Sequence, residues 1–368
     1  MRANDKGRHL MISVLHVIPG WFELISLAFC IGVLVCRLWV FPPSADTAST
    51  HGDWLAGMWR WFGIGVGVMI ACTTSNLFVR AVEMSGLSFF SVFPILPVVL
   101  FRTHFGRVWI IRIAAEILLL ISLKVFGQRR DSRVFLVFTL VLGGLIAGTE
   151  SASGHSSDAG DFSLPEITDL LHLLVISIWG GGLLVLSIFL LPEIVKPDDD
   201  RTAPRGAGIA LRFSRIAGFA VGIVAITALY NGYLYVGSFE ALWKSTYGLI
   251  VIAKTGLFLL LVNFGAFNRY VSVPLLQEWA GASPQERGVI TRTALRFSPR
   301  LQLEGNGGMV ASRFMRSVKV ETALIVGLLL CAALLRHEVP ARHLHHLGHA
   351  DGKPMHMHQG EGGPPAAP

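Results

Sequence analysis

The chain has 368 residues, of which 52% are hydrophobic and only 15% are charged, and its mean hydropathy is +0.58. A soluble protein needs more charged side chains than this to cover its surface. The composition therefore excludes the soluble classes and predicts an all-α polytopic membrane protein. The net charge of +7 does not indicate nucleic acid as a partner. In a membrane protein, the positions of the basic residues indicate how the helices are oriented in the bilayer. No nucleotide-binding loop or nucleophile motif is visible, so we expect no enzyme activity.

Eight apolar stretches are long enough to cross a bilayer core, which needs about 20 residues per helix. In chain order they cover residues 13–36, 61–79, 108–126, 134–150, 170–191, 216–236, 249–268 and 319–335. A ninth apolar run, 87–101, is short and contains Pro94 and Pro97, which favours a re-entrant or interfacial segment. We therefore predict eight transmembrane helices in two four-helix halves, residues 1–150 and 151–336. The second half contains a long cytoplasmic loop at 269–319, and a tail follows at 337–368.

The positions of Lys and Arg orient these helices. If both termini lie outside, the inner loops hold 19 basic residues and the outer segments hold 10. The outer loop 150–169 is acidic instead, with Glu150, Asp158, Asp161, Glu166 and Asp169. The positive-inside rule therefore predicts that both termini lie on the outer side.

Two short motifs predict an internal repeat. Thr103-His104-Phe105-Gly106 is followed by Arg112 six residues after its glycine, and Thr246-Tyr247-Gly248 is followed by Lys254 at the same spacing. The first helices of the two halves correspond as well, because His16 and Glu23 share a spacing of seven residues with His172 and Trp179. With four helices in each half, the two halves would have the same orientation rather than an inverted one.

The histidines gather at one side of the membrane in this orientation. Of the 13 histidines, all except His51 fall in outer segments or near the outer face. His16 and His172 lie near the starts of the first and fifth helices, and His155 follows the fourth helix. Ionisable residues within a membrane mark functional sites by default, although one such histidine is often an interfacial residue with a hydrogen-bond partner. We predict that His16, His155 and His172 form a metal site, with Glu23 two turns deeper.

The tail 337–368 is rich in histidine, methionine, glycine and proline. It has too little apolar surface to fold, so we expect it to be disordered. Imidazole together with thioether is a ligand set suited to copper, whereas histidine alone would also bind zinc or nickel non-specifically. The predicted ligands in the tail are His343, His345, His346, His349, Met355, His356, Met357 and His358.

Several segments together resemble the CopD copper-resistance membrane proteins. The resemblance is strongest over 154–269 and weaker over the first two helices. It rests on Gly154-His155, Leu171-His172, Trp179-Gly180-Gly181-Gly182-Leu183, Arg212-Phe213-Ser214-Arg215, Gly237-Ser238, Thr246-Tyr247-Gly248, Lys254, Asn268-Arg269, and His104-Phe105-Gly106-Arg107 with Trp109 and Arg112. The resemblance implies an eight-helix protein of the bacterial inner membrane with periplasmic termini. It would move copper ions between periplasm and cytoplasm, alongside a periplasmic copper carrier protein.

Two other functions fit the same residues. Paired histidines between helices also hold b-type haem, and His16 with His172 would form such a pair in a membrane electron carrier. A copper sensor or an assembly scaffold would use the same metal ligands without transport. A visible spectrum separates the first alternative from copper transport, and metal flux in proteoliposomes separates the second.

Overall fold

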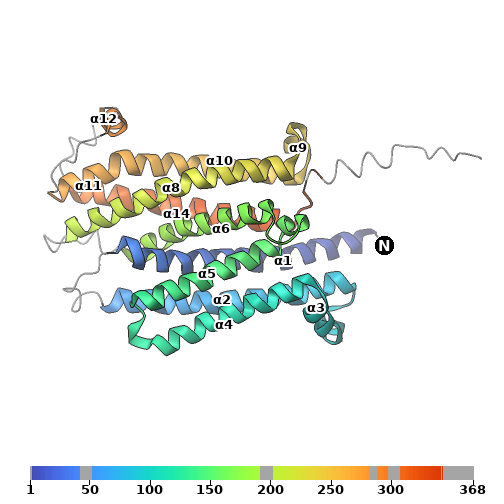
Figure 1. Ribbon diagram of the computed structural model, residues 1–368. Coiled ribbons are helices and arrows are strands. Elements are labelled where there is room, and N and C mark those ends of the chain that lie inside the picture. The colour runs from blue at the N-terminus through green and yellow to red at the C-terminus, as the bar shows by residue number, and fades with distance from the viewer. Residues whose placement is uncertain are drawn as a thin grey trace, which may run out of the picture.

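The chain folds into an elongated bundle of helices in this computed structural model, which describes residues 2–41, 52–190, 202–281, 288–296, 307–340 and 342. All regular elements within these ranges are helical, and seven of the helices are long and apolar enough to cross a membrane. The long helices run roughly parallel to one another, as Figure 1 shows. The tail ligands predicted at 343–358 lie outside the described residues.

The described residues of each predicted apolar stretch lie within a longer helix or its π-helical continuation. The first half contains α1 (Arg2–Val35), its π-helical continuation η1 (Cys36–Val40), α2 (Gly52–Ser85), α4 (His104–Phe126) and α5 (Arg133–Ala152). The second half contains α6 (Leu164–Val185) with its continuation η6 (Leu186–Leu190), α8 (Thr202–Val236), α10 (Thr246–Phe267) and α14 (Gly307–Leu335). Hydropathy identifies only the part of a helix that suits the hydrocarbon core, so it misses the polar turns beyond it.

Short elements connect the long helices at the two ends of the bundle. One end carries η2 (Phe89–Ser91), η3 (Phe93–Ile95), α3 (Leu96–Arg102), η5 (His155–Ala159) and α9 (Phe239–Lys244), and we call it the α3/α9 end. The opposite, α11/α12 end carries η4 (Gly127–Arg129), η7 (Asn268–Ser272), α11 (Val273–Trp279) and α12 (Val289–Arg296). The described part of the region expected as one loop at 269–319 therefore contains η7, α11, α12 and the first turns of α14.

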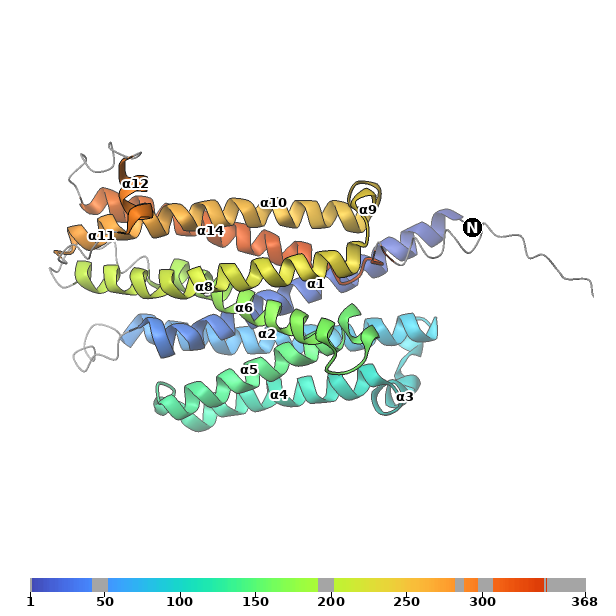
Figure 2. The same cartoon turned by 45° about the horizontal axis from the view of Figure 1, so that its top comes forward.

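The two halves meet where α1 packs along α6. Figure 2 shows these helices between the α2, α4 and α5 layer and the α8, α10 and α14 layer. A β-carbon added at Gly181 would lie 1.8 Å from the Ala28 carbonyl oxygen, and one at Gly32 would lie 2.1 Å from the Gly181 backbone. Only glycine allows two helix backbones to approach so closely, as small residues do in many membrane helix pairs.

The two motifs of the predicted repeat fold alike. Thr103 and Ser245 each cap the following helix by accepting a hydrogen bond from the amide of Gly106 or Gly248, at 3.0 and 2.9 Å. Each hydroxyl also donates to a carbonyl of the preceding short helix, α3 or α9, at 2.6 Å. The two glycines are required here, because a β-carbon at either would clash with the backbone of that short helix. The same turn therefore introduces α4 and α10.

We expect Gly181→Ala to disrupt the α1–α6 contact, because the new methyl group overlaps the Ala28 carbonyl. Overpacking typically costs about 1–3 kcal/mol, and a clash with backbone lies at the upper end. Gly67→Ala on α2 is the matched control, since a β-carbon there has nothing within 4 Å. The thermal unfolding midpoint in detergent should fall for Gly181→Ala and stay or rise for Gly67→Ala. Equal midpoints for the two variants would show that the close contact does not hold the halves together.

Candidate functional site

His16 is the predicted ligand whose surroundings the structure defines best. The residue is only 5% exposed although it lies in the turns of α1 nearest the α3/α9 end. Its Nε2 lies 2.7 Å from Glu83 Oε1 on α2, and its ring stacks on His337, with 4.7 Å between the ring centroids. His337 lies two residues after the end of α14, so the first and last long helices each bring one imidazole to this point.

Glu23 lies two turns deeper on α1, where three donor side chains and the carboxyl group of Glu150 lie next to it. Thr73 Oγ1 lies 2.9 Å from its Oε1 and Asn76 Nδ2 lies 2.8 Å from its Oε2, both from α2. Arg112 Nη1 on α4 lies 3.3 Å from Oε1. Both carboxylate oxygens of Glu23 therefore have partners already, which favours a role in holding the site over direct metal binding.

Arg112 is the centre of a buried ionic network. Its Nη1 lies 2.5 Å from Glu150 Oε1 on α5, and its Nη2 donates to the Thr149 carbonyl at 2.6 Å and to the Ser153 hydroxyl at 2.5 Å. Arg336, directly after α14, pairs with the other oxygen of Glu150. Two guanidinium groups thus face the carboxyl groups of Glu23 and Glu150, and such pairing is how ionisable groups inside a membrane protein are accommodated.

A fifth ionisable group, Glu116 on α4, borders this network and forms no ion pair within the described residues. Thr73 Oγ1 lies 2.8 Å from Glu116 Oε1 as well as 2.9 Å from Glu23 Oε1. A hydroxyl has one hydrogen to donate, so one of these two carboxyl groups must itself carry a hydrogen. Glu23 faces Arg112 and Asn76, and we therefore assign this hydrogen to Glu116.

His172 lies on α6 in the second half and faces α8. Its Nδ1 is 2.8 Å from Thr227 Oγ1, and that hydroxyl donates to the Ile223 carbonyl at 2.8 Å. Because the hydroxyl hydrogen is used there, we assign the hydrogen between the two groups to Nδ1, so that His172 donates to Thr227. The Nε2 of His172 is then the nitrogen with a free lone pair, as a metal ligand requires.

The structure joins only some of the predicted ligands. His16 and Glu23 border one polar cluster, whereas His172 has its own partner on α8. The 3₁₀ helix η5 begins at His155, whose side chain is outside the described part. Within the described residues, no group of three or more His, Cys, Asp or Glu side chains is arranged to hold a metal ion. Sequence reasoning did not select Glu83, Arg336 and His337, although the position of the last two directly after the final span was a usable signal.

Two family descriptions match the chain. The one named Copper resistance protein D-like, N-terminal domain, matches residues 11–162, and the one named Copper resistance protein D matches residues 207–335. No solved structure matches the chain.

Three known proteins are similar over parts of the chain. The Copper resistance protein D of Pseudomonas syringae pv. tomato is 26% identical over 244 residues, which are 65% of this chain and 75% of that protein. The Copper transport protein CutJ of Bacillus subtilis (strain 168) is 31% identical over 173 residues, 46% of this chain and 31% of CutJ. The Inner membrane protein YebZ of Escherichia coli (strain K12) is 25% identical over 179 residues, 48% of this chain and 58% of YebZ. The chain thus spans less than two thirds of the length of the last two.

The network predicts unequal effects of replacing its carboxyl groups. Glu116→Gln keeps a neutral group that can donate to Thr73, so the unfolding midpoint in detergent should change little. Glu23→Gln removes the charge opposite Arg112 and leaves the cluster with a surplus positive charge. Breaking a buried pair in this way costs about 3–5 kcal/mol, so its midpoint should fall clearly. If Glu116→Gln destabilised the protein as much as Glu23→Gln, the assignment of the hydrogen to Glu116 would be wrong.

Proposed function

Because the chain belongs to the copper resistance protein D family, we propose that it carries copper across the bacterial inner membrane, from periplasm to cytoplasm. It is a multi-pass membrane protein, with seven helices that are long and apolar enough to cross. The observation that best supports transport is the stacked pair of His16 and His337 at the α3/α9 end, beside the carboxylate of Glu83. Imidazole binds both common oxidation states of copper.

The proposed topology has eight membrane crossings, with α4 as the eighth. This helix has 23 residues, and its central charged residues Arg112 and Glu116 are buried in the bundle. Between Arg107 and Lys124, the side chains that this helix exposes are apolar, including Ile111, Ile117 and Ile121. A helix with this pattern can face lipid, because its charges pair within the protein. Eight crossings place both termini in the periplasm, as the distribution of Lys and Arg predicts.

The proposed entry site lies at the periplasmic, α3/α9 end. His16, His155 and His172 receive the ion there, His337 adds a fourth imidazole, and Glu23 holds the network below His16. The tail histidines and methionines at 343–358 raise the local copper concentration, and a periplasmic copper carrier is the proposed donor. Cu(I) is satisfied by two or three soft or borderline ligands, so transfer between such imidazoles needs little rearrangement.

A cavity beside Trp179 offers a continuation of this route in the second half. It has a volume of about 380 Å³ and is lined by residues of α6, α8, α10, η7 and α14, including Glu321 and Asn268. Asn268 donates to the buried carboxyl group of Glu321, and the Oδ1 of this asparagine has no partner among the described residues. Oxygen atoms of this kind can solvate a cation that passes Trp179.

The two alternatives receive less support. Haem ligation needs His16 and His172 to face each other across one gap, whereas each imidazole has its own partner, Glu83 or Thr227. A sensor or scaffold would share the metal ligands but would not need the second-half cavity.

The topology predicts the labelling of two introduced cysteines. Asp158→Cys and Pro368→Cys should both react with an impermeant thiol reagent in spheroplasts, because both positions would face the periplasm. The four native cysteines are buried and should give little background. Labelling at position 158 with protection at position 368 would mean an odd number of crossings between them.

Copper binding tests the proposed ligands. In protein that ends at Arg342, His155→Ala and His172→Ala should each lower copper affinity by at least about tenfold, the order expected from losing one of two or three ligands. His16→Ala should do so less completely, since His337 remains beside it. Copper uptake into proteoliposomes should fall in the same order.

His104→Ala is the matched control for these variants. His104 lies at the same end of the bundle, where its Nε2 is 3.0 Å from Asp161 Oδ1 on the exposed surface. Its replacement should leave copper binding and uptake unchanged. Wild-type stoichiometry and uptake in both His155→Ala and His172→Ala would exclude the proposed entry site.

A further inference from the structure

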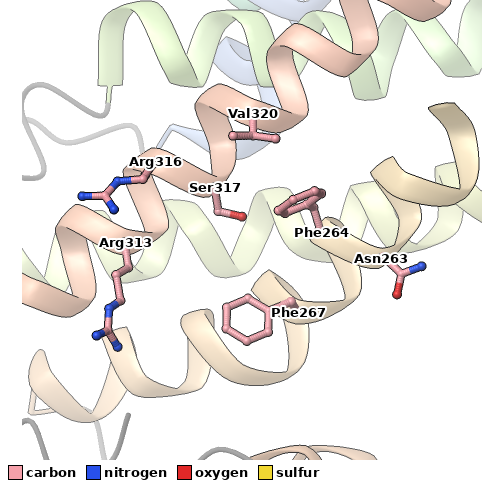
Figure 3. A pocket seen from close by; sticks show the side chains of 7 residues that line it. All are labelled: Asn263, Phe264, Phe267, Arg313, Arg316, Ser317 and Val320. Atoms are coloured by element: carbon pink, nitrogen blue, oxygen red, sulfur yellow. The ribbon is translucent and has the colours of Figure 1, made fainter. Parts of the chain in front are cut away.

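A groove on the outside of the bundle combines an apolar wall with two basic side chains. It runs between α10 and α14 in the half of the bundle nearer the α11/α12 end and has a volume of about 430 Å³. Figure 3 shows its lining residues, which are Asn263, Phe264 and Phe267 from α10 and Arg313, Arg316, Ser317 and Val320 from α14. None of these residues belongs to the proposed copper route.

The apolar part of the groove suits a hydrocarbon chain. Phe264, Phe267 and Val320 remain 37%, 42% and 38% exposed, on a surface that faces the lipid in the proposed topology. Side chains in this position contact acyl chains, and a hollow between two helices holds one chain in a fixed place better than a flat surface does.

The basic part of the groove suits a phosphate group. Arg313 and Arg316 are exposed, and Figure 3 shows their guanidinium groups at one end of the groove, beyond the rings of Phe264 and Phe267. Guanidinium groups form strong charge-assisted hydrogen bonds with phosphate oxygens. The phosphate headgroup of a lipid would therefore lie at the basic end of the groove, and its acyl chain would lie along the apolar part.

Ser317, between the two parts, has a hydroxyl group that lacks a partner. Its Oγ is buried, and it makes no hydrogen bond among the described residues. A helical serine or threonine commonly donates to the carbonyl four residues earlier, as Thr322 on the same helix does to Val318 at 2.8 Å. The Ser317 hydroxyl is thus available to a ligand in the groove, where a glycerol ester or phosphodiester oxygen can accept its hydrogen.

We infer that this groove binds one anionic phospholipid, from the leaflet next to the α11/α12 end. Arg313 and Arg316 bind the phosphate, Ser317 donates to the oxygens next to it, and one acyl chain lies along Phe264, Phe267 and Val320. A lipid whose headgroup carries its own positive charge neutralises the phosphate and binds less tightly. A free phosphate lacks the chain and makes no use of the apolar wall.

Native mass spectrometry of the purified full-length protein, titrated with phosphatidylglycerol or phosphatidylcholine, tests this inference. Wild-type protein should bind the first phosphatidylglycerol on the order of tenfold more tightly than phosphatidylcholine, as two basic residues near a headgroup predict. The double variant Arg313→Gln/Arg316→Gln should lose this preference and bind phosphatidylcholine as before. Unchanged phosphatidylglycerol affinity in that variant would overturn the inference.

The control removes the same charge elsewhere at the same end of the bundle. Arg60 and Arg133 are exposed and do not line the groove, so Arg60→Gln/Arg133→Gln should keep the preference for phosphatidylglycerol. An equal loss in both double variants would overturn the site in favour of general attraction by the basic surface. Ser317→Ala, which keeps every charge, should lower phosphatidylglycerol affinity about threefold, the low end for one hydrogen bond. Inorganic phosphate should not displace the lipid, and displacement would identify a free-anion site instead.

Discussion

The pairing of buried charges around Arg112 is the constraint on which the rest of the site depends. An unpaired charge inside a membrane bundle is costly, so Glu23, Arg112, Glu150 and Arg336 must stay together once the helices assemble. The four residues come from α1, α4, α5 and the turn after α14. Because the ion pair with Glu150 fixes the position of Arg336, the next residue, His337, is placed where its ring stacks on His16. The ionic network therefore positions the imidazole pair, while its own carboxyl groups are paired within the network.

The turns before α4 and α10 share one geometry, but the residues around the histidines of α1 and α6 differ in chemistry. The same capped turn introduces α4 and α10, with Gly106 and Gly248 in equivalent contacts. At the position seven residues after the histidine, however, the first half has Glu23 and the second has Trp179, which is buried against Phe258 of α10. The first half thus holds a charged network below its histidine, and the second holds an aromatic wall beside a cavity. This difference is consistent with the proposed route, in which the ion enters at the α3/α9 end and continues through the cavity beside Trp179.

Much of the fold follows from the sequence, because hydropathy and helix length are local properties. The described residues of the eight apolar stretches each lie in a long helix or its continuation, and the proline-containing run at 87–101 forms only short helices. The partners of the histidines were not predictable in the same way. His16 meets Glu83 and His337 only because α1, α2 and the end of α14 converge, and no spacing within the sequence encodes that convergence. The sequence alone also predicts that Glu23 can bind metal, whereas in the fold three donors from α2 and α4 occupy its oxygens.

The central claim is that copper enters through imidazole ligands at the α3/α9 end. X-ray absorption at the copper edge, on protein that ends at Arg342 and holds one Cu(I), tests it most directly. The account predicts a spectrum dominated by nitrogen with the outer-shell scattering of imidazole rings, and a lower nitrogen count in His172→Ala. A spectrum dominated by sulfur, unchanged in that variant, would contradict the account and point to the buried cysteines or to the methionines.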